Sequence, residues 1–279
     1  MKKLIALVLA AVLALSLVAS ASALQIAVPN DPTNEGRALL LLQTAGYITL
    51  KEDAGITATV ADIVENPLGI EFYEAEAAAL PNLLADVDYA IINNNFALDA
   101  GLVPSNGLLV EAADSPYVNV LSVKEGNEDA PLTKALIAAL SSQQVVDFFT
   151  ATYPNGDCVC TLTNVTDGYD PEVDYDALAG QTIVVGGTPN PHVYVLNIAK
   201  EILAAKGITL QVAEYTDYVL PNEALEAGDL YANFFAHSPY QENFNAENGT
   251  HIVNVLGIHV EPMAMYGGKQ TDLSALSAQ

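Results

Sequence analysis

Short apolar runs alternate with amphipathic helical patterns along the chain after about residue 24. The run QIAVP at 25–29 predicts a strand, and the stretch 31–46 that follows predicts a helix ending at Gly46. Further on, residues 70–75 and 88–93 read as strands on either side of a short helix at 78–86. Strand–helix–strand alternation is typical of a mostly parallel sheet covered by helices.

The pattern renews itself from about residue 115. A strand at 117–123 and two helices near 132–139 and 143–152 precede a polar stretch, 154–176, which we interpret as a linker or long surface loop. Beyond it, strands and helices alternate again: strands at 181–187, 208–215, 229–235 and 251–260, helices at 192–207, 221–228 and 238–249. The chain therefore predicts two α/β lobes.

The N-terminus has the pattern of a secretory signal. Lys2 and Lys3 precede an apolar run at 4–18, and Ala21-Ser22-Ala23 provides a small-residue cleavage site. The alternative is a retained anchor helix, but the run is shorter than a membrane-spanning helix requires. We expect residues 1–23 to be a signal peptide and the exported protein to be soluble, periplasmic or extracellular, without stable membrane insertion.

The composition of the chain makes some classes of binding partner unfavourable. The chain has 34 acidic residues against 9 basic ones, a net charge of −25, which disfavours nucleic acid and anionic lipid. Cys158 and Cys160 are too few for a disulfide framework, and their close spacing would strain a bond between them. The four histidines are scattered, so we expect no metal site and no cofactor.

Two polar motifs suggest a site for an α-amino acid. Arg37, the sole arginine, lies one turn into the predicted helix, where a guanidinium suits a carboxylate; the alternative is a surface pair with Asp31 or Glu35. Three amides, 93–95, follow a buried strand and could accept an ammonium group, although turn chemistry explains at least one of them.

Aromatic residues could supply an apolar slot, although such residues are more often ordinary core. Phe234 and Phe235 must point to opposite faces of a strand, so at most one of them can face a cleft. His192 and His237 are weak signals by themselves, because a lone histidine usually has a structural role. Because the chain has no GxSxG elbow, no P-loop and no GxGxxG opening a helix, we expect no catalytic residues and no enzyme.

Long motifs of the chain closely resemble the NlpA-like methionine-binding lipoproteins. They include IAVPNDPTNEGRALLLLQTAG, DYAIINNNFALDAGL, ADSPYVNV, TPNPH, EYTDYVLPNEALEAGDLYANFFAHSPYQENF and IHVEPMAMY. The resemblance implies a type II periplasmic-binding-protein-like fold, with two mixed sheets flanked by helices and joined by a hinge. It implies a monomer that captures methionine or a close analogue and delivers it to the permease of an ABC importer.

The resemblance also implies roles for particular residues. Arg37 would pair with the ligand carboxylate, and Asn93 would bind the polar head, with Asn34 and Asn95 as weaker candidates. Tyr218, Phe235 and His237 would enclose the thioether side chain.

Two features depart from the family. The lipid-anchoring cysteine expected after the signal is missing, and the order of the motifs is rotated. We interpret this order as a circular permutation in which the stretch after Tyr153 joins the family's ends. Lobe A then comprises 24–115 plus 264–279, and lobe B comprises 116–263 with the linker 154–176. The interpretation predicts that Gln279 and Leu24 lie close together and that Tyr153 and Gln181 share the other lobe.

Two further functions stay open at this stage. A secreted scavenger or the input domain of a sensor would bind the same ligand without an importer, and the missing lipid anchor favours it. A hydrolase whose motifs are no longer visible is the third possibility, which a turnover assay would test.

Overall fold

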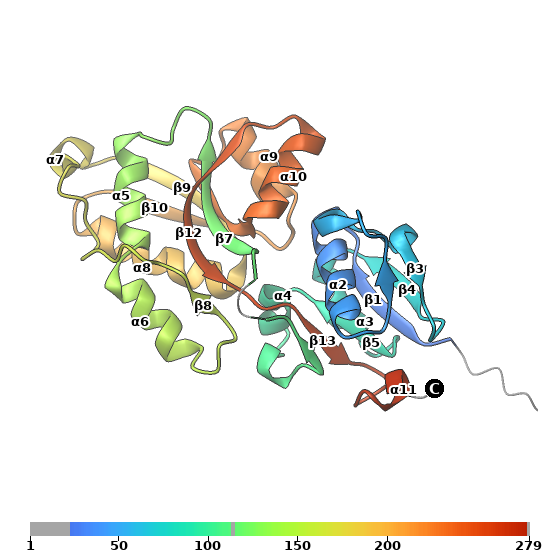
Figure 1. The fold of residues 1–279 in the computed structure, drawn as a ribbon. Coiled ribbons are helices and arrows are strands. Elements are labelled where there is room, and N and C mark those ends of the chain that lie inside the picture. Colours follow the sequence, from blue (N-terminus) through green and yellow to red (C-terminus); the bar gives the residue numbers. More distant parts are fainter. Residues whose placement is uncertain (1–22, 113–114, 278–279) are drawn as a thin grey trace, which may run out of the picture.

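The computed structural model describes residues 23–112 and 115–277. All but the last residue of the predicted signal peptide, and Gln279, lie outside the described residues. Figure 1 shows two bodies side by side, each built on its own sheet.

The first sheet has five strands in the order β4-β1-β5-β13-β6. β1 (Gln25–Pro29) lies between β4 (Glu71–Ala75) and β5 (Tyr89–Ile92), parallel to both. β13 (Ala264–Gly267) and β6 (Leu109–Val110) complete it in antiparallel pairing. Because β1 and β5 are covered on both faces, all but one of their residues are buried, which explains their nearly continuous apolar sequences.

Helix α2 (Pro32–Thr44) covers this sheet. It begins at Asp31, whose side chain accepts a hydrogen bond from the backbone N–H of Asn34, and Pro32 occupies its first turn. It ends before Gly46, whose φ of 81° suits a residue without a Cβ. Its buried residues pack with Ile26 and Val28 of β1 in one core. Smaller elements complete the body: β2 (Thr49–Leu50), β3 (Ile63–Glu65), α3 (Leu80–Leu83), α4 (Asn94–Asp99), α11 (Ser274–Ser277) and 3-10 turns at Gly55–Thr57, Val60–Asp62, Ala77–Ala79 and Pro104–Asn106.

The second sheet has six strands in the order β10-β9-β11-β7-β12-β8. β9 is parallel to β10 and β11, whereas β7 is antiparallel to β11 and β12. Its strands are β7 (Val118–Lys124), β8 (Val159–Cys160), β9 (Thr182–Gly187), β10 (Thr209–Glu214), β11 (Ala232–His237) and β12 (Ile252–Val260). Helices flank it: α5 (Pro131–Leu140), α6 (Gln143–Thr152), α7 (Tyr175–Leu178), α8 (Tyr194–Ala204) after the π-turn Pro189–Val193, α9 (Leu220–Ala227) and α10 (Ser238–Asn248). Two mixed sheets with flanking helices confirm the predicted α/β fold class.

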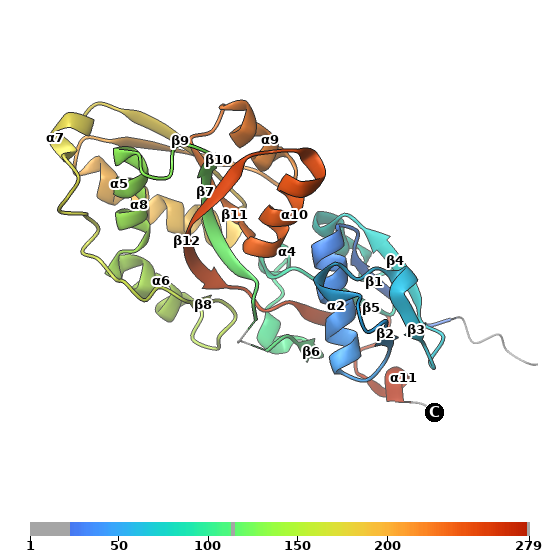
Figure 2. The ribbon, with the colours of Figure 1, turned by 45° about the horizontal axis from the view of Figure 1, so that its top comes forward.

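Two stretches of chain cross between the bodies. The first leads from β6 to β7 and the second from β12 to β13, and Figure 2 shows the second passing near α4. The crossings are bonded to each other, since the backbone N–H of Glu111 donates to the carbonyl of Met263 at 2.9 Å. Neighbouring crossings of this kind allow two lobes to move about one axis.

The polar stretch 154–176 is more ordered than the interpretation as a linker or loop expected. β8 pairs with β12 through Cys160 and His259, and Cys158 is buried in the core of the second body. Both cysteines are free. Local periodicity could not reveal a two-residue strand whose stability comes from its neighbour.

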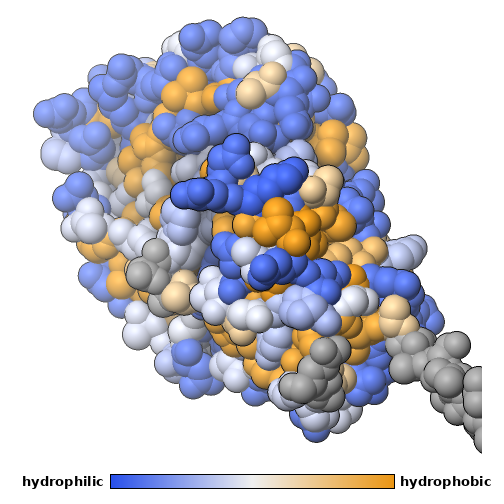
Figure 3. All heavy atoms as spheres, turned by 45° about the vertical axis from the view of Figure 1, so that its right-hand side comes forward, coloured by the Kyte–Doolittle hydropathy of each residue, from blue (hydrophilic) through white to orange (hydrophobic). Residues whose placement is uncertain are grey.

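The two ends of the described chain belong to the first body. Leu276 of α11 is buried in the same core against which Leu24 packs, and Figure 1 draws the C-terminal end beside this body. Hydrophilic residues cover most of the upper part of the face in Figure 3, with hydrophobic patches between them. None of the helices in residues 23–112 and 115–277 has the length and apolar character needed to cross a membrane.

Candidate ligand-binding site

A small cavity, partly open to solvent, lies where the two bodies meet. One side comes from α2, the end of β5 and α4, and the other from β7, β11, the start of α10 and the residues after β10 and β12. All seven residues predicted as site residues line it, together with five others; the full set is Asn34, Arg37, Asn93, Asn94, Asn95, Asn119, Tyr218, Phe235, Ala236, His237, Tyr240 and Glu261.

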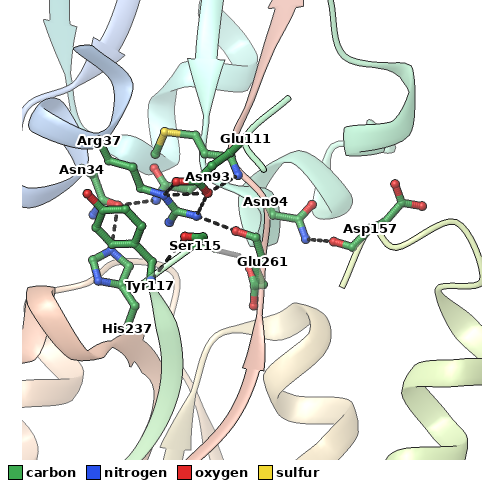
Figure 4. A network of polar contacts seen from close by, with 11 residues as sticks. Asn34, Arg37, Asn93, Asn94, Glu111, Ser115, Tyr117, Asp157, His237 and Glu261 are labelled. Carbon is green, nitrogen blue, oxygen red and sulfur yellow. Dashed lines mark hydrogen bonds and ion pairs between the residues drawn. The ribbon is translucent and has the colours of Figure 1, made fainter. Parts of the chain in front are cut away.

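A relay of hydrogen bonds fixes the amides on the first side. The Asn34 amide nitrogen donates to both carboxylate oxygens of Asp31 at 3.0 Å, so the Asn34 amide oxygen faces the cavity side. That oxygen accepts from the Asn93 amide nitrogen at 2.7 Å, as Figure 4 shows. Asn34 is thereby fully engaged and orients Asn93.

His237 joins the same oxygen from the opposite body. Its Nδ1 accepts from the backbone N–H of Tyr240 at 3.1 Å, so the ring proton sits on Nε2, which donates to Asn34 Oδ1 at 3.0 Å. Burial, assisted by the charge of Arg37, holds the pKa of His237 well below its usual value, so the ring is neutral. The contact bridges the two bodies directly above the cavity.

Several buried amide atoms on this wall have no hydrogen-bond partner among the described residues. They are Oδ1 of Asn93, Oδ1 of Asn94 and Nδ2 of Asn95. The other polar atom of each amide does have a partner; for example, Asn95 Oδ1 accepts from the Tyr218 hydroxyl at 2.6 Å. A buried polar atom without a partner is costly, so these atoms mark positions where a polar ligand would be stabilised.

Arg37 is buried, and its guanidinium lies between the two crossings. Nε donates to both oxygens of Glu111 at 3.0 and 3.1 Å, while Nη2 contacts Glu111 and donates to the Glu261 carbonyl at 2.6 Å. The guanidinium also lies 4.3 Å from the centre of the Tyr117 ring. The alternative of a surface pair with Asp31 or Glu35 is wrong, because Asp31 bonds Asn34 and Glu35 accepts from Val60. Nη1 has no hydrogen-bond partner among residues 23–112 and 115–277, and Arg37 lines the cavity.

Aromatic rings form the second side of the cavity. The Tyr218 ring centre lies 5.9 Å from that of Phe235 and 5.7 Å from that of Tyr240, and the Tyr240 hydroxyl donates to the Tyr218 carbonyl at 2.8 Å. Phe235 faces this cluster, whereas Phe234 is buried in the core of the second body. The expectation that at most one of the pair faces the cleft is therefore confirmed.

A buried cluster of His192, His259 and Glu261 lies beside the cavity. Burial lowers the pKa of each histidine to about 3, so both rings are neutral. His192 Nε2 faces the oxygens of Asn119 and Glu261 at 3.1 and 3.3 Å and therefore carries the ring proton. This bond orients the amide of Asn119, which lines the cavity.

Among the described residues, these three side chains form the group whose spacing could hold a metal ion, with ligand atoms within 4.8 Å of one another. His259 Nε2 lies 2.7 Å from Glu261 Oε1, a hydrogen-bond distance. Bonds of about 2.0–2.1 Å would hold the ligands of a tetrahedral zinc ion roughly 3.3 Å apart. As it stands, the cluster is hydrogen-bonded rather than arranged around a metal.

Asn94 belongs to the amide run 93–95, and Tyr240 is one of the aromatic residues that could supply the apolar slot. Three other lining residues were not singled out from the sequence: Asn119, Ala236 and Glu261. Two of them carry a signal in the sequence. Asn119 is an amide inside an apolar strand, and Glu261 is a carboxylate directly after one. Glu111, which pairs with Arg37 across 74 positions, has no local signal at all.

Several known proteins are similar to parts of this chain. The D-methionine-binding lipoprotein MetQ of Escherichia coli O157:H7 is 48% identical over 126 residues, covering 44% of this chain and 46% of the relative. MetQ of Yersinia pestis matches to the same extent. The chain thus aligns with less than half the length of these relatives. A nutrient binding protein from Burkholderia cenocepacia, solved bound to methionine, is 46% identical over 47% of this chain and 56% of that chain, with a TM-score of 0.46. The model of the NlpA lipoprotein family matches residues 16–161 and 183–279, so this chain belongs to the NlpA lipoprotein family.

Proposed function

We propose that this chain is an extracytoplasmic binding protein that captures methionine, or a close amino-acid analogue, and delivers it to an ABC importer without catalysing a reaction. The curated relatives support the ligand class, because they are named D-methionine-binding lipoproteins. The observation that carries the proposal is the cavity itself, which joins a cation and free amide oxygens to an aromatic wall.

Each part of an amino acid has a partner in this arrangement. Arg37 Nη1 would pair with the carboxylate, while the free oxygens of Asn93 and Asn94 would accept hydrogen bonds from the ammonium group. Tyr218, Phe235 and His237 would enclose the thioether, since sulfur packs favourably against aromatic rings. Asn34 acts through Asn93 and His237, because all its amide contacts are already made.

The lobe boundaries and the permuted order belong to the same proposal. Lobe A would comprise 24–115 and 264–279, and lobe B would comprise 116–263, in line with the strand content of the two sheets. Two observations support a permutation: the family model matches in two segments that leave out 162–182, and α11 packs into the same core as Leu24. We further propose export with cleavage after Ala23 and a monomeric, soluble product.

Titration calorimetry with D- and L-methionine tests the ligand. Arg37→Ala should weaken binding by roughly 30- to 1000-fold, from the loss of about 2–4 kcal/mol in charge-assisted contacts, and Asn93→Ala somewhat less. Lys200→Ala and Asn82→Ala remove a cation and an amide from exposed positions and should leave the affinity unchanged. Binding of both site variants within about threefold of the wild type would show that the site is wrongly assigned.

A further inference from the structure

Three consecutive asparagines lie at the start of helix α4, and each contacts a different part of the protein. Asn93 bonds Asn34 within lobe A, and Asn95 accepts from Tyr218 of lobe B. Asn94 turns the other way: its amide nitrogen donates to the carbonyl of Asp157 at 2.7 Å and to Cys158 Sγ at 3.2 Å. Figure 4 shows the Asn94–Asp157 bond leading away from the Arg37 cluster.

The segment Asp157–Cys158 also holds a second point of lobe A. The Asp157 carboxylate accepts from the backbone N–H of Ser105 at 2.8 Å, and Ser105 lies in the turn Pro104–Asn106. Asp157 is only 6% exposed, so its charge is largely removed from water and its partner matters.

On its other side the segment is fixed to lobe B. Cys158 belongs to the core of that lobe, and the next two residues, Val159 and Cys160, pair with β12. A rigid attachment on one lobe and three polar contacts on the other form a bridge between them. This bridge consists of side-chain and backbone contacts and is not itself one of the two crossings of the chain.

We propose that Asp157–Cys158 is an interlobe clasp that favours the closed form and that it also orients Asn94, whose amide nitrogen it holds and whose amide oxygen faces the ligand. The proposal rests on the ligand-binding function proposed above. With its nitrogen held by the clasp, the Asn94 amide keeps its unpartnered oxygen on the side of the cavity that it lines.

Closure provides the link to affinity. A ligand enclosed by both lobes binds tightly only to the closed state. Its apparent dissociation constant therefore rises as the population of the closed state falls. Contacts that exist only between closed lobes therefore contribute to binding without touching the ligand. One net hydrogen bond of this kind corresponds to about a 3- to 10-fold change in affinity.

Two measurements on the full exported chain test the clasp: small-angle scattering without ligand and calorimetry with methionine. Asp157→Ala should increase the radius of gyration of the ligand-free protein and weaken methionine binding about 3- to 10-fold. Asn94→Ala should increase the radius in the same way and weaken binding further, because it also removes the oxygen that faces the ligand. Asp157→Asn keeps an oxygen acceptor for Ser105 and should restore both values. Glu172→Ala removes an exposed carboxylate from the polar stretch 154–176 and should behave as the wild type.

The outcomes separate the clasp from the proposed function. If Asp157→Ala and Asn94→Ala match Glu172→Ala in size and affinity, the clasp does not exist. If only Asn94→Ala weakens binding and neither variant changes the radius, Asn94 acts on the ligand directly and the clasp is again refuted. If no variant, and not even the wild type, binds methionine, the proposed function fails, while the scattering still decides the clasp.

Discussion

The ion pair between Arg37 and Glu111 ties helix α2 to the first crossing, and its removal should be costly. Arg37 is 4% exposed and Glu111 16% exposed, so each charge depends on the other. Losing one partner of a buried pair costs about 3–5 kcal/mol, and the partial exposure of Glu111 favours the lower end. We expect Arg37→Met to lower the free energy of unfolding by about 3 kcal/mol.

Glu111→Gln is milder because its amide oxygen can still accept one of the N–H groups that Glu111 receives from Arg37 and from Met263. We expect a loss of about 2 kcal/mol for it. The double variant leaves no unpaired buried charge, so it should lose about 3 kcal/mol, well below the sum of the single losses. The coupling between the two residues is then about 2 kcal/mol.

Urea unfolding of the ligand-free protein at pH 7, followed by circular dichroism, measures the wild type and these three variants. The exposed pair Lys51–Asp62, with side chains 49% and 26% exposed, is the control, because Lys51→Met and Asp62→Asn should couple by less than about 0.5 kcal/mol. A double variant of Arg37 and Glu111 whose loss equals the sum of the single losses within about 0.5 kcal/mol would refute the pairing.

Further predictions concern pH, packing and the amide relay. Burial holds the pKa of His259 at about 3 in the folded protein, whereas the histidine of the unfolded chain has its ordinary pKa of 6.5. Below pH 6.5 the unfolded chain therefore binds a proton that the folded chain does not, and stability falls as the pH drops. His192 acts in the same direction, and Glu261, whose pKa burial raises, acts in the opposite one. His259→Gln keeps a donor for Glu261, and urea unfolding at pH 7 and 5 should show a loss on acidification about 1–2 kcal/mol smaller than in the wild type; an unchanged loss would contradict this. Gly36→Ala should destabilise by about 1–3 kcal/mol despite the higher helix propensity of alanine, because the new Cβ would lie 2.4 Å from the Ile56 carbonyl oxygen; an unchanged melting temperature would show that the chain at Ile56 yields. Asp31→Ala removes both the N-cap of α2 and the anchor of Asn34, so it should cost about 1–2 kcal/mol in thermal unfolding and also weaken methionine binding, although Asp31 does not line the cavity; intact affinity would argue against the relay.

Local patterns determined most of the elements. The strand at Gln25–Pro29 has the predicted bounds, and helix α2 begins and ends within two residues of its predicted limits, because an N-cap aspartate, a proline and a terminal glycine act within a few residues. The motifs also named seven side chains that line one cavity, and their roles toward a ligand stay a prediction.

Tertiary structure decided what depends on distant partners. The short strands β6 and β8 exist only because β13 and β12 offer them hydrogen bonds, and their two residues carry no pattern of their own. The direction of each amide in Asn93, Asn94 and Asn95 follows from a different neighbour, which the sequence shows as three identical letters. The sequence suggested a ligand carboxylate for Arg37, with Asp31 or Glu35 as the alternative. Only the packing of the two crossings against α2 brings Glu111, 74 positions away, to the Arg37 guanidinium.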